Sequence, residues 1–304
     1  MDHPEQTLLL PDLAMHEVAV LGACRIIALT GTSKPGLDYA LSDDAVDQDY
    51  LEIREVSHGG HVPSLSIDNR SDQPVLILEG DILVGGKQNR MCNSTVMAPG
   101  NSSLEIPVSC VESRRWRYNS RKFRKPRSTS SIDVLRKLKS GKFNQGSHSS
   151  NQAAIWQAIE EVQRQARYSS PTDDHGEVLM LRGSDLQQFL DTATCPTDAI
   201  GLAVILGARG HVVDIFDRPT TCQHYWRQKV SSALPTIIDT SMPAEAASTE
   251  TLKQELDELK ATRWKSIEAV GMGIELRTTT KYRSQATALC VDDVPIHLNL
   301  VSRE

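Results

Sequence analysis

Short runs of alternating apolar and polar residues fill the first 110 positions of the chain. A period of two is typical of β-strands that bury one face, and β-branched residues are frequent in these runs. Turn-forming residues separate them, as at positions 69–74 and 98–101. The pattern predicts strands at residues 17–28, 51–56, 63–68, 75–78, 90–98 and 103–109.

The second half of the chain alternates helical and strand-like patterns. Apolar residues at Ile155, Ile159, Val162 and Ala166 mark one face of a helix over residues 151–167. Further helical patterns cover residues 184–192, 220–234 and 249–264. A hairpin is predicted from strands 200–206 and 211–216, and strands at 272–280, 284–291 and 296–301 close the chain.

The close spacing of the early strands indicates the fold class. A parallel sheet would need a helix between successive strands, so an antiparallel meander or barrel-like core is favoured. Because strands flank the helices on both sides, the two ends of the chain can share one sheet. We expect a single α+β domain over residues 1–304, with several packing helices and a basic, mobile excursion around residues 117–150.

Composition excludes several classes of protein. No run approaches the ~20 apolar residues of a membrane span, and the first 22 residues lack the basic start of a secretory signal. The six cysteines are dispersed without a CxxC pair. His58 and His61 suit a glycine-rich turn better than a metal site. We expect a cytoplasmic protein without membrane contact or metal ligands, and the sequence does not identify a cofactor.

Charge is concentrated in one segment. Residues 114–142 contain 12 Lys and Arg against one acid, which gives +11, whereas the whole chain carries −6 and the remainder therefore −17. Such asymmetry argues against general nucleic-acid binding and makes this segment a candidate contact for an anionic partner.

Polar side chains that could bind a ligand or take part in catalysis gather between residues 78 and 116. Two clusters, at 85–90 and 109–116, are separated by an alternating run and a turn that would place them on neighbouring strands. Lys87 follows two glycines, but a phosphate-binding P-loop also requires a glycine where Asp81 stands and a Ser or Thr where Gln88 stands. The candidate ligand-binding residues are Lys87, Gln88, Asn89, Arg90, Arg115 and Trp116.

The ligand-binding candidates suit a nucleotide or sugar-phosphate. Lys87 provides a point charge, Arg90 can grip a phosphate with two hydrogen bonds, and the two glycines would let the backbone approach a ligand. The alternative is a plain turn whose charged side chains lie in solvent. Trp116 could stack on a base or cover the edge of the core.

Three residues are candidates for catalysis. Cys110 and Glu112 share a face if their strand continues; Glu112 could be a general acid or base, and Cys110 a nucleophile if nearby positive charge lowers its pKa. A buried, inert thiol is the alternative. Glu79 could orient a cation or ribose diol together with Asp81, or it could form a structural bridge to Arg90 or Arg115.

At these residues the chain resembles the family named the ADP-ribosylglycohydrolase and rhodanese-phosphatase-superfamily-associated protein domain. The resemblance rests on Gly80 with its acidic neighbours, on residues 85–90 and 107–112, and on Arg115-Trp116. Weaker agreement at 69–74, 152–156, 201–216 and 296–298 extends it over most of the chain. It implies a ligand derived from NAD or containing ADP-ribose.

We therefore expect a hydrolase-type enzyme that acts on an ADP-ribose or related nucleotide. Hydrolysis is the simplest reaction, because the chain has no dinucleotide fingerprint, P-loop or metal-ligand spacing. Two alternatives stay open. One is a non-catalytic binding module or scaffold for the same ligand, and the other is RNA or phosphoprotein binding through residues 114–142.

Overall fold

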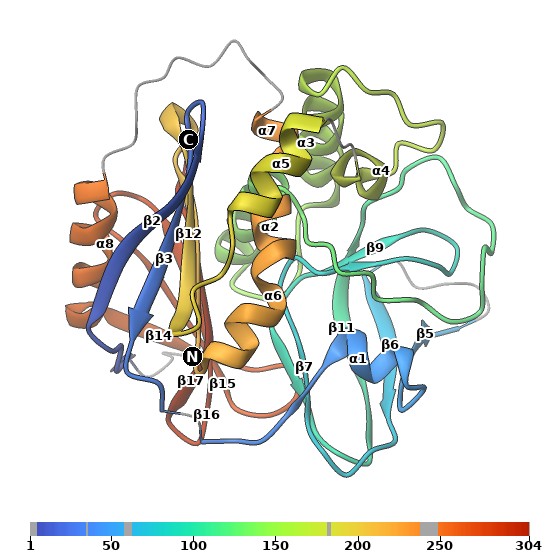
Figure 1. Cartoon of the computed structure of the whole chain (residues 1–304). Coiled ribbons are helices and arrows are strands. Elements are labelled where there is room, and N and C mark those ends of the chain that lie inside the picture. The colour runs from blue at the N-terminus through green and yellow to red at the C-terminus, as the bar shows by residue number, and fades with distance from the viewer. Residues whose placement is uncertain (1–4, 35, 58–62, 181–183, 238–248, 304) are drawn as a thin grey trace. The chain divides into compact units, whose positions relative to one another are not determined.

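The computed structural model describes residues 5–34, 36–57, 63–180, 184–237 and 249–303 (Figure 1). Contacts within the chain group into two compact units. Unit 1 comprises residues 1–37, 182–269 and 273–304, and unit 2 comprises residues 38–181 and 270–272. The single domain stays a prediction, and we describe each unit separately. The glycine-rich turn expected at residues 58–62 lies outside the described residues.

Unit 1 is built on a nine-stranded sheet whose neighbours all pair antiparallel. Strands from both ends of the chain lie in this one sheet, which confirms the expected arrangement (Figure 1). In sheet order the strands are β1 (Glu5–Thr7), β14 (Arg263–Glu268), β15 (Ile274–Thr279), β16 (Gln285–Val291), β17 (Val294–Val301), β13 (His211–Phe216), β12 (Ala199–Leu206), β3 (Cys24–Gly31) and β2 (Leu13–Leu21).

Helices cover both faces of this sheet. On one face, Leu252, Leu256 and Leu259 of α8 (Thr249–Ala261) join the sheet core. On the other, Tyr225 of α6 (Pro219–Ser231) stacks on Phe216. Each buried leucine contributes about 1.5–3 kcal/mol to stability. The remaining helices of the unit are α5 (Ser184–Thr192), α7 (Leu234–Ile237) and the 3₁₀ turn η1 (Gly207–Arg209).

The helix predicted over residues 249–264 ends earlier, at Ala261. Trp264 lies in β14, where it is fully buried and donates a hydrogen bond from its ring nitrogen to the Leu259 carbonyl at 3.2 Å. Residues of β14 find backbone partners on both β1 and β15. The sheet pairing therefore overrides the helical periodicity at this point.

Unit 2 contains two smaller sheets around one apolar core. The five-stranded sheet has the order β5 (Leu51–Glu55), β6 (Ser64–Asn69), β11 (Ser102–Cys110), β9 (Arg90–Cys92) and β8 (Ile82–Leu83). The three-stranded sheet has the order β10 (Val96–Ala98), β7 (Val75–Ile77) and β4 (Ala40–Leu41). With the sheet of unit 1, these elements confirm a mostly antiparallel α+β fold.

Helices complete unit 2, and one lies in the basic segment. The elements are α1 (Ser42–Asp47), α2 (Ile132–Gln145), α3 (Gln152–Gln165) and α4 (His175–Leu179). Where we expected a mobile excursion, Lys122 and Arg124 form β-bridges to Arg54 and Val84, and α2 packs against α3. None of the described helices combines the length and apolar composition needed to span a bilayer.

Candidate functional site

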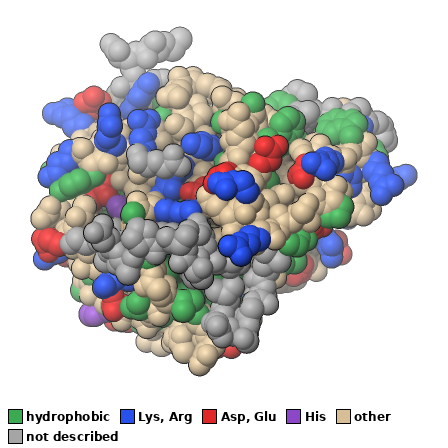
Figure 2. Space-filling view, turned by 90° about the horizontal axis from the view of Figure 1, so that it is seen from above, with side chains coloured by type: hydrophobic (Ala, Val, Ile, Leu, Met, Phe, Trp, Pro, Cys, Tyr) green, Lys and Arg blue, Asp and Glu red, His purple; other side chains and the backbone are tan. Residues whose placement is uncertain are grey.

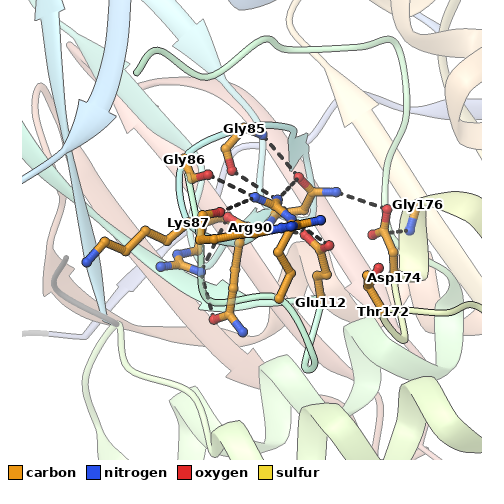
Figure 3. Close-up of polar contacts among 12 residues, drawn as sticks. Gly85, Gly86, Lys87, Arg90, Glu112, Thr172, Asp174 and Gly176 are labelled. Atoms are coloured by element: carbon orange, nitrogen blue, oxygen red, sulfur yellow. Dashed lines mark hydrogen bonds and ion pairs between the residues drawn. The ribbon is translucent and has the colours of Figure 1, made fainter. Parts of the chain in front are cut away.

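The two polar clusters of the sequence lie on neighbouring strands of unit 2. Residues 84–89 connect β8 to β9, and Arg90 of β9 pairs with Cys110 at the end of β11. Because β9 lies between β8 and β11, the glycine loop and the segment after Cys110 meet at one end of the sheet (Figure 3). Strand pairing therefore brings together residues that are 20 or more positions apart.

Glu112 and Arg115 form a clamp on the glycine loop. Arg115 donates from Nε and Nη2 to the two carboxylate oxygens of Glu112, at 2.7 and 2.6 Å. Its Nη1 donates to the Gly86 carbonyl at 2.9 Å, and the Asn89 backbone N–H donates to Glu112 at 3.0 Å. Glu112 is buried. Both charged groups are thus engaged with each other and with the loop (Figure 3).

The two glycines are required by the protein's own packing. Gly86 has a φ of +52°, in the region that favours glycine, and a Cβ there would overlap the ring of Phe123. A Cβ on Gly85 would lie 2.6 Å from the hydroxyl oxygen of Ser120. The space beside the loop is therefore occupied by residues of the basic segment, where we had expected a ligand to approach.

Asp174 joins this cluster from a distant part of the sequence. One of its carboxylate oxygens accepts a hydrogen bond from the Asn89 side chain at 2.9 Å, and the other accepts the Gly176 backbone N–H at 3.0 Å, which caps α4 (Figure 3). Burial raises the pKa of Asp174 to about 6 despite these hydrogen bonds, and the charges of Glu112 and Glu177 add to the rise. Our sequence reading missed Asp174, because an Asp before a short helix indicates only a cap.

Arg90 and Cys110 form a buried pair beneath the loop. Nη1 of Arg90 lies 3.1 Å from the sulfur of Cys110 and 3.3 Å from the side-chain oxygen of Gln88. Burial raises the pKa of the Cys110 thiol, and Arg90 opposes this rise only in part. The thiol is therefore protonated at neutral pH. Its role as a nucleophile stays a prediction that this environment does not favour.

Glu79 belongs to a different cluster. Its two carboxylate oxygens lie 2.7 Å from Nζ of Lys139 and 2.6 Å from Nζ of Lys142, both on α2, and all three side chains are buried. Asp81 pairs in the same way with buried Lys125, at 3.2 Å. Burial favours a raised pKa for Glu79, but the two ammonium groups outweigh it and hold that pKa well below its usual range. Glu79 thus links the loop between β7 and β8 to helix α2.

The solvent-facing part of the motif is the side chain of Lys87. Its ammonium lies 5.3 Å from the ring centroids of both Trp116 and Tyr118. Those rings are 50% and 45% exposed, so each keeps surface for a further contact. The backbone N–H of Lys87 donates to Glu55 at 3.0 Å. We call Lys87, Trp116 and Tyr118 the aromatic platform, in which Tyr118 was not foreseen from the sequence.

Most of the charge in the basic segment is balanced inside the protein. At least eight of its 12 Lys and Arg residues make ion pairs with described residues: Arg114, Arg115, Lys122, Lys125, Arg127, Arg136, Lys139 and Lys142. On the face shown in Figure 2, Lys and Arg side chains lie in separate groups with acids among them. This arrangement does not favour the continuous basic surface that RNA binding requires.

Comparison with known proteins identifies a family. The model of the ARG and Rhodanese-Phosphatase-superfamily-associated Protein domain matches residues 12–301, which include the site and parts of both units. Searches of curated proteins and of solved structures found no match.

Proposed function

The chain belongs to the ARG and Rhodanese-Phosphatase-superfamily-associated Protein domain family, and we propose that it binds a nucleotide of the ADP-ribose type at the aromatic platform. The observation that carries the proposal is that the Lys87 ammonium lies 5.3 Å from the ring centroids of Trp116 and Tyr118, two half-exposed residues. An aromatic face stacks on a nucleobase, and an ammonium attracts a phosphate. A nucleotide of the ADP-ribose type contains both a base for stacking and phosphates for the ammonium.

The clamp beneath the platform supports a binding role. Arg115 holds the carbonyls of Gly85 and Gly86, and Glu112 holds both Arg115 and the Asn89 backbone. A loop that is fixed before the ligand arrives loses little conformational entropy on binding. Glu112 and Arg115 then contribute by positioning Lys87 and Trp116, without having to touch the ligand themselves.

Calorimetric titration with ADP-ribose tests this proposal. We expect saturable binding, and a loss of affinity of about tenfold or more in Lys87→Gln and in Trp116→Leu, since a charge-assisted contact and a stacked base are each worth about 1–3 kcal/mol. Arg124→Gln removes a positive charge from an exposed residue outside the platform and should leave affinity unchanged. Undiminished binding by both platform variants would refute the proposed surface.

Hydrolysis of the same ligand is a second candidate, supported by one observation. Asp174 has a pKa of about 6, close to the value that suits a general acid or base at neutral pH, and it is hydrogen-bonded to Asn89 of the loop. Glu112 and Cys110, our candidates from the sequence, are engaged in the contacts described above. Incubation with ADP-ribose conjugates and NAD, with mass spectrometry of the products, should then show turnover that Asp174→Asn abolishes.

A further inference from the structure

Unit 2 has an open depression beside the aromatic platform, with a volume of about 520 Å³. This volume lies within the range of about 300–1,000 Å³ that is typical of small-molecule sites. Tyr118 belongs to both the platform and the wall of the depression, so the two are continuous. The lining residues are Arg54, Glu55, Val56, Ser57, Tyr118 and Arg121.

The carboxylate of Glu55 is incompletely satisfied. Only 9% of Glu55 is exposed, and its Oε1 accepts the Lys87 backbone N–H at 3.0 Å. Its Oε2 has no hydrogen-bond partner within the described residues. Among the described residues its ion-pair partner is Arg90, whose Nη2 lies 3.6 Å from Oε1, too far for a good hydrogen bond. A buried acceptor without a donor is costly, so a ligand hydroxyl that donates to Glu55 would be favoured.

The rim of the depression carries two exposed guanidinium groups. Arg121 makes no side-chain hydrogen bond or ion pair that can be identified among the described residues. The side chain of Arg54 is 48% exposed, and its one polar contact with the described residues is a long one, 3.5 Å, with Glu52. Both groups thus remain able to bind phosphate oxygens, for which a guanidinium is well suited. Two nearby cations also disfavour a metal ion at Glu55.

We propose that this depression binds the nucleoside diphosphate part of the ligand, with a ribose hydroxyl donating to Glu55. The base stacks on the ring of Tyr118, and the phosphates lie at Arg121 and Arg54. A carboxylate that accepts ribose hydroxyls selects ribonucleotides over deoxyribonucleotides, as in dinucleotide-binding folds. The inference rests on the proposed nucleotide-binding function and adds to it the residue that reads the sugar.

The test compares ligands on the intact protein, because Glu55→Gln would leave buried Arg90 without its anion. We would titrate the wild-type chain with ADP, 2′-deoxy-ADP and 3′-deoxy-ADP, and with ADP-ribose. One of the two deoxy ligands should bind about tenfold more weakly than ADP, the effect expected for the loss of a hydrogen bond to a charged group. Arg121→Gln should weaken ADP to a similar extent, and Arg124→Gln, outside the depression, should not.

Two outcomes would overturn the inference, and they can be told apart. The first outcome is equal affinity for ADP and both deoxy ligands, together with unchanged ADP binding by Arg121→Gln. This outcome would exclude the depression as the binding site, even if the protein binds ADP-ribose and Lys87→Gln weakens that binding. In that case the proposed function stands and this inference fails. Absence of binding by all of these nucleotides at millimolar concentration would refute both.

Discussion

The carboxylate of Glu112 accepts two hydrogen bonds from the guanidinium of Arg115, at 2.7 and 2.6 Å, across a turn of only three residues. In the sequence these residues were candidates for chemistry and for ligand binding. In the structure they neutralise each other, and together they hold the loop that carries Lys87. The two charged groups of the sequence motif thus hold the protein's own glycine loop in place.

Glu112→Gln should reduce the free energy of unfolding by about 3 kcal/mol, because breaking a buried ion pair leaves the partner charge uncompensated. Urea denaturation at pH 7 would measure the loss. Glu161→Gln is the matched control: its pair with Arg164 on α3 is exposed, so the cost should be below about 1 kcal/mol. Equal losses in the two variants would show that the clamp is not structural.

Glu79 should make the protein sensitive to acid. Its pKa is depressed in the folded state by Lys139 and Lys142, against the effect of burial. The stabilisation is therefore complete above the unfolded pKa of about 4.3 and is lost as the pH falls below it. Urea denaturation between pH 6 and pH 3 should show a steeper decline for the wild type than for Glu79→Gln, which starts lower.

The exposed carboxylate of Glu105 provides the control for this experiment. Glu105→Gln should leave both the stability at pH 6 and the decline on acidification close to those of the wild type. If Glu79→Gln behaved in the same way as Glu105→Gln, the buried ion cluster would not contribute to stability.

Asp174 should have the opposite pH dependence. Its folded pKa of about 6 lies above the unfolded value of about 3.9, so the folded state binds a proton between these values that the unfolded chain does not. Its contribution to stability therefore decreases as the pH rises from about 4 to 6. Carboxyl NMR should give a titration midpoint near 6 for Asp174, and Asp174→Asn should remove this dependence. A midpoint near 4 would contradict the prediction.

Gly86→Ala should damage both stability and binding. A Cβ at this position combines an unfavourable backbone conformation with overlap of the Phe123 ring, and we expect a loss of about 2–4 kcal/mol. Gly146→Ala separates the two effects, since Gly146 has a similar φ of +61° and no atom within 4 Å of the added Cβ. That control should lose only about 1 kcal/mol. Equal losses would show that Phe123 does not fill the space beside Gly86.

Local pattern was a good guide to many elements. The strand predicted at residues 103–109 is β11, and the helix predicted at 151–167 is α3, because each buries one face and its apolar residues repeat with the matching period. The same reasoning failed at Trp264. Leu252, Leu256 and Leu259 have helical spacing, but pairing with the neighbouring strands decides the backbone conformation of Trp264.

Three features could be predicted from the amino-acid pattern alone: the mostly antiparallel α+β character, the shared sheet of the two chain ends, and the meeting of the two polar clusters on adjacent strands. These features follow from periodicity and turn positions, which are local. The partner of each charged group, in contrast, became known from the folded structure. Glu79 meets Lys142 63 residues away, and Asn89 meets Asp174 85 residues away. Burial and ion pairing depend on such distant contacts, and no local pattern encodes them.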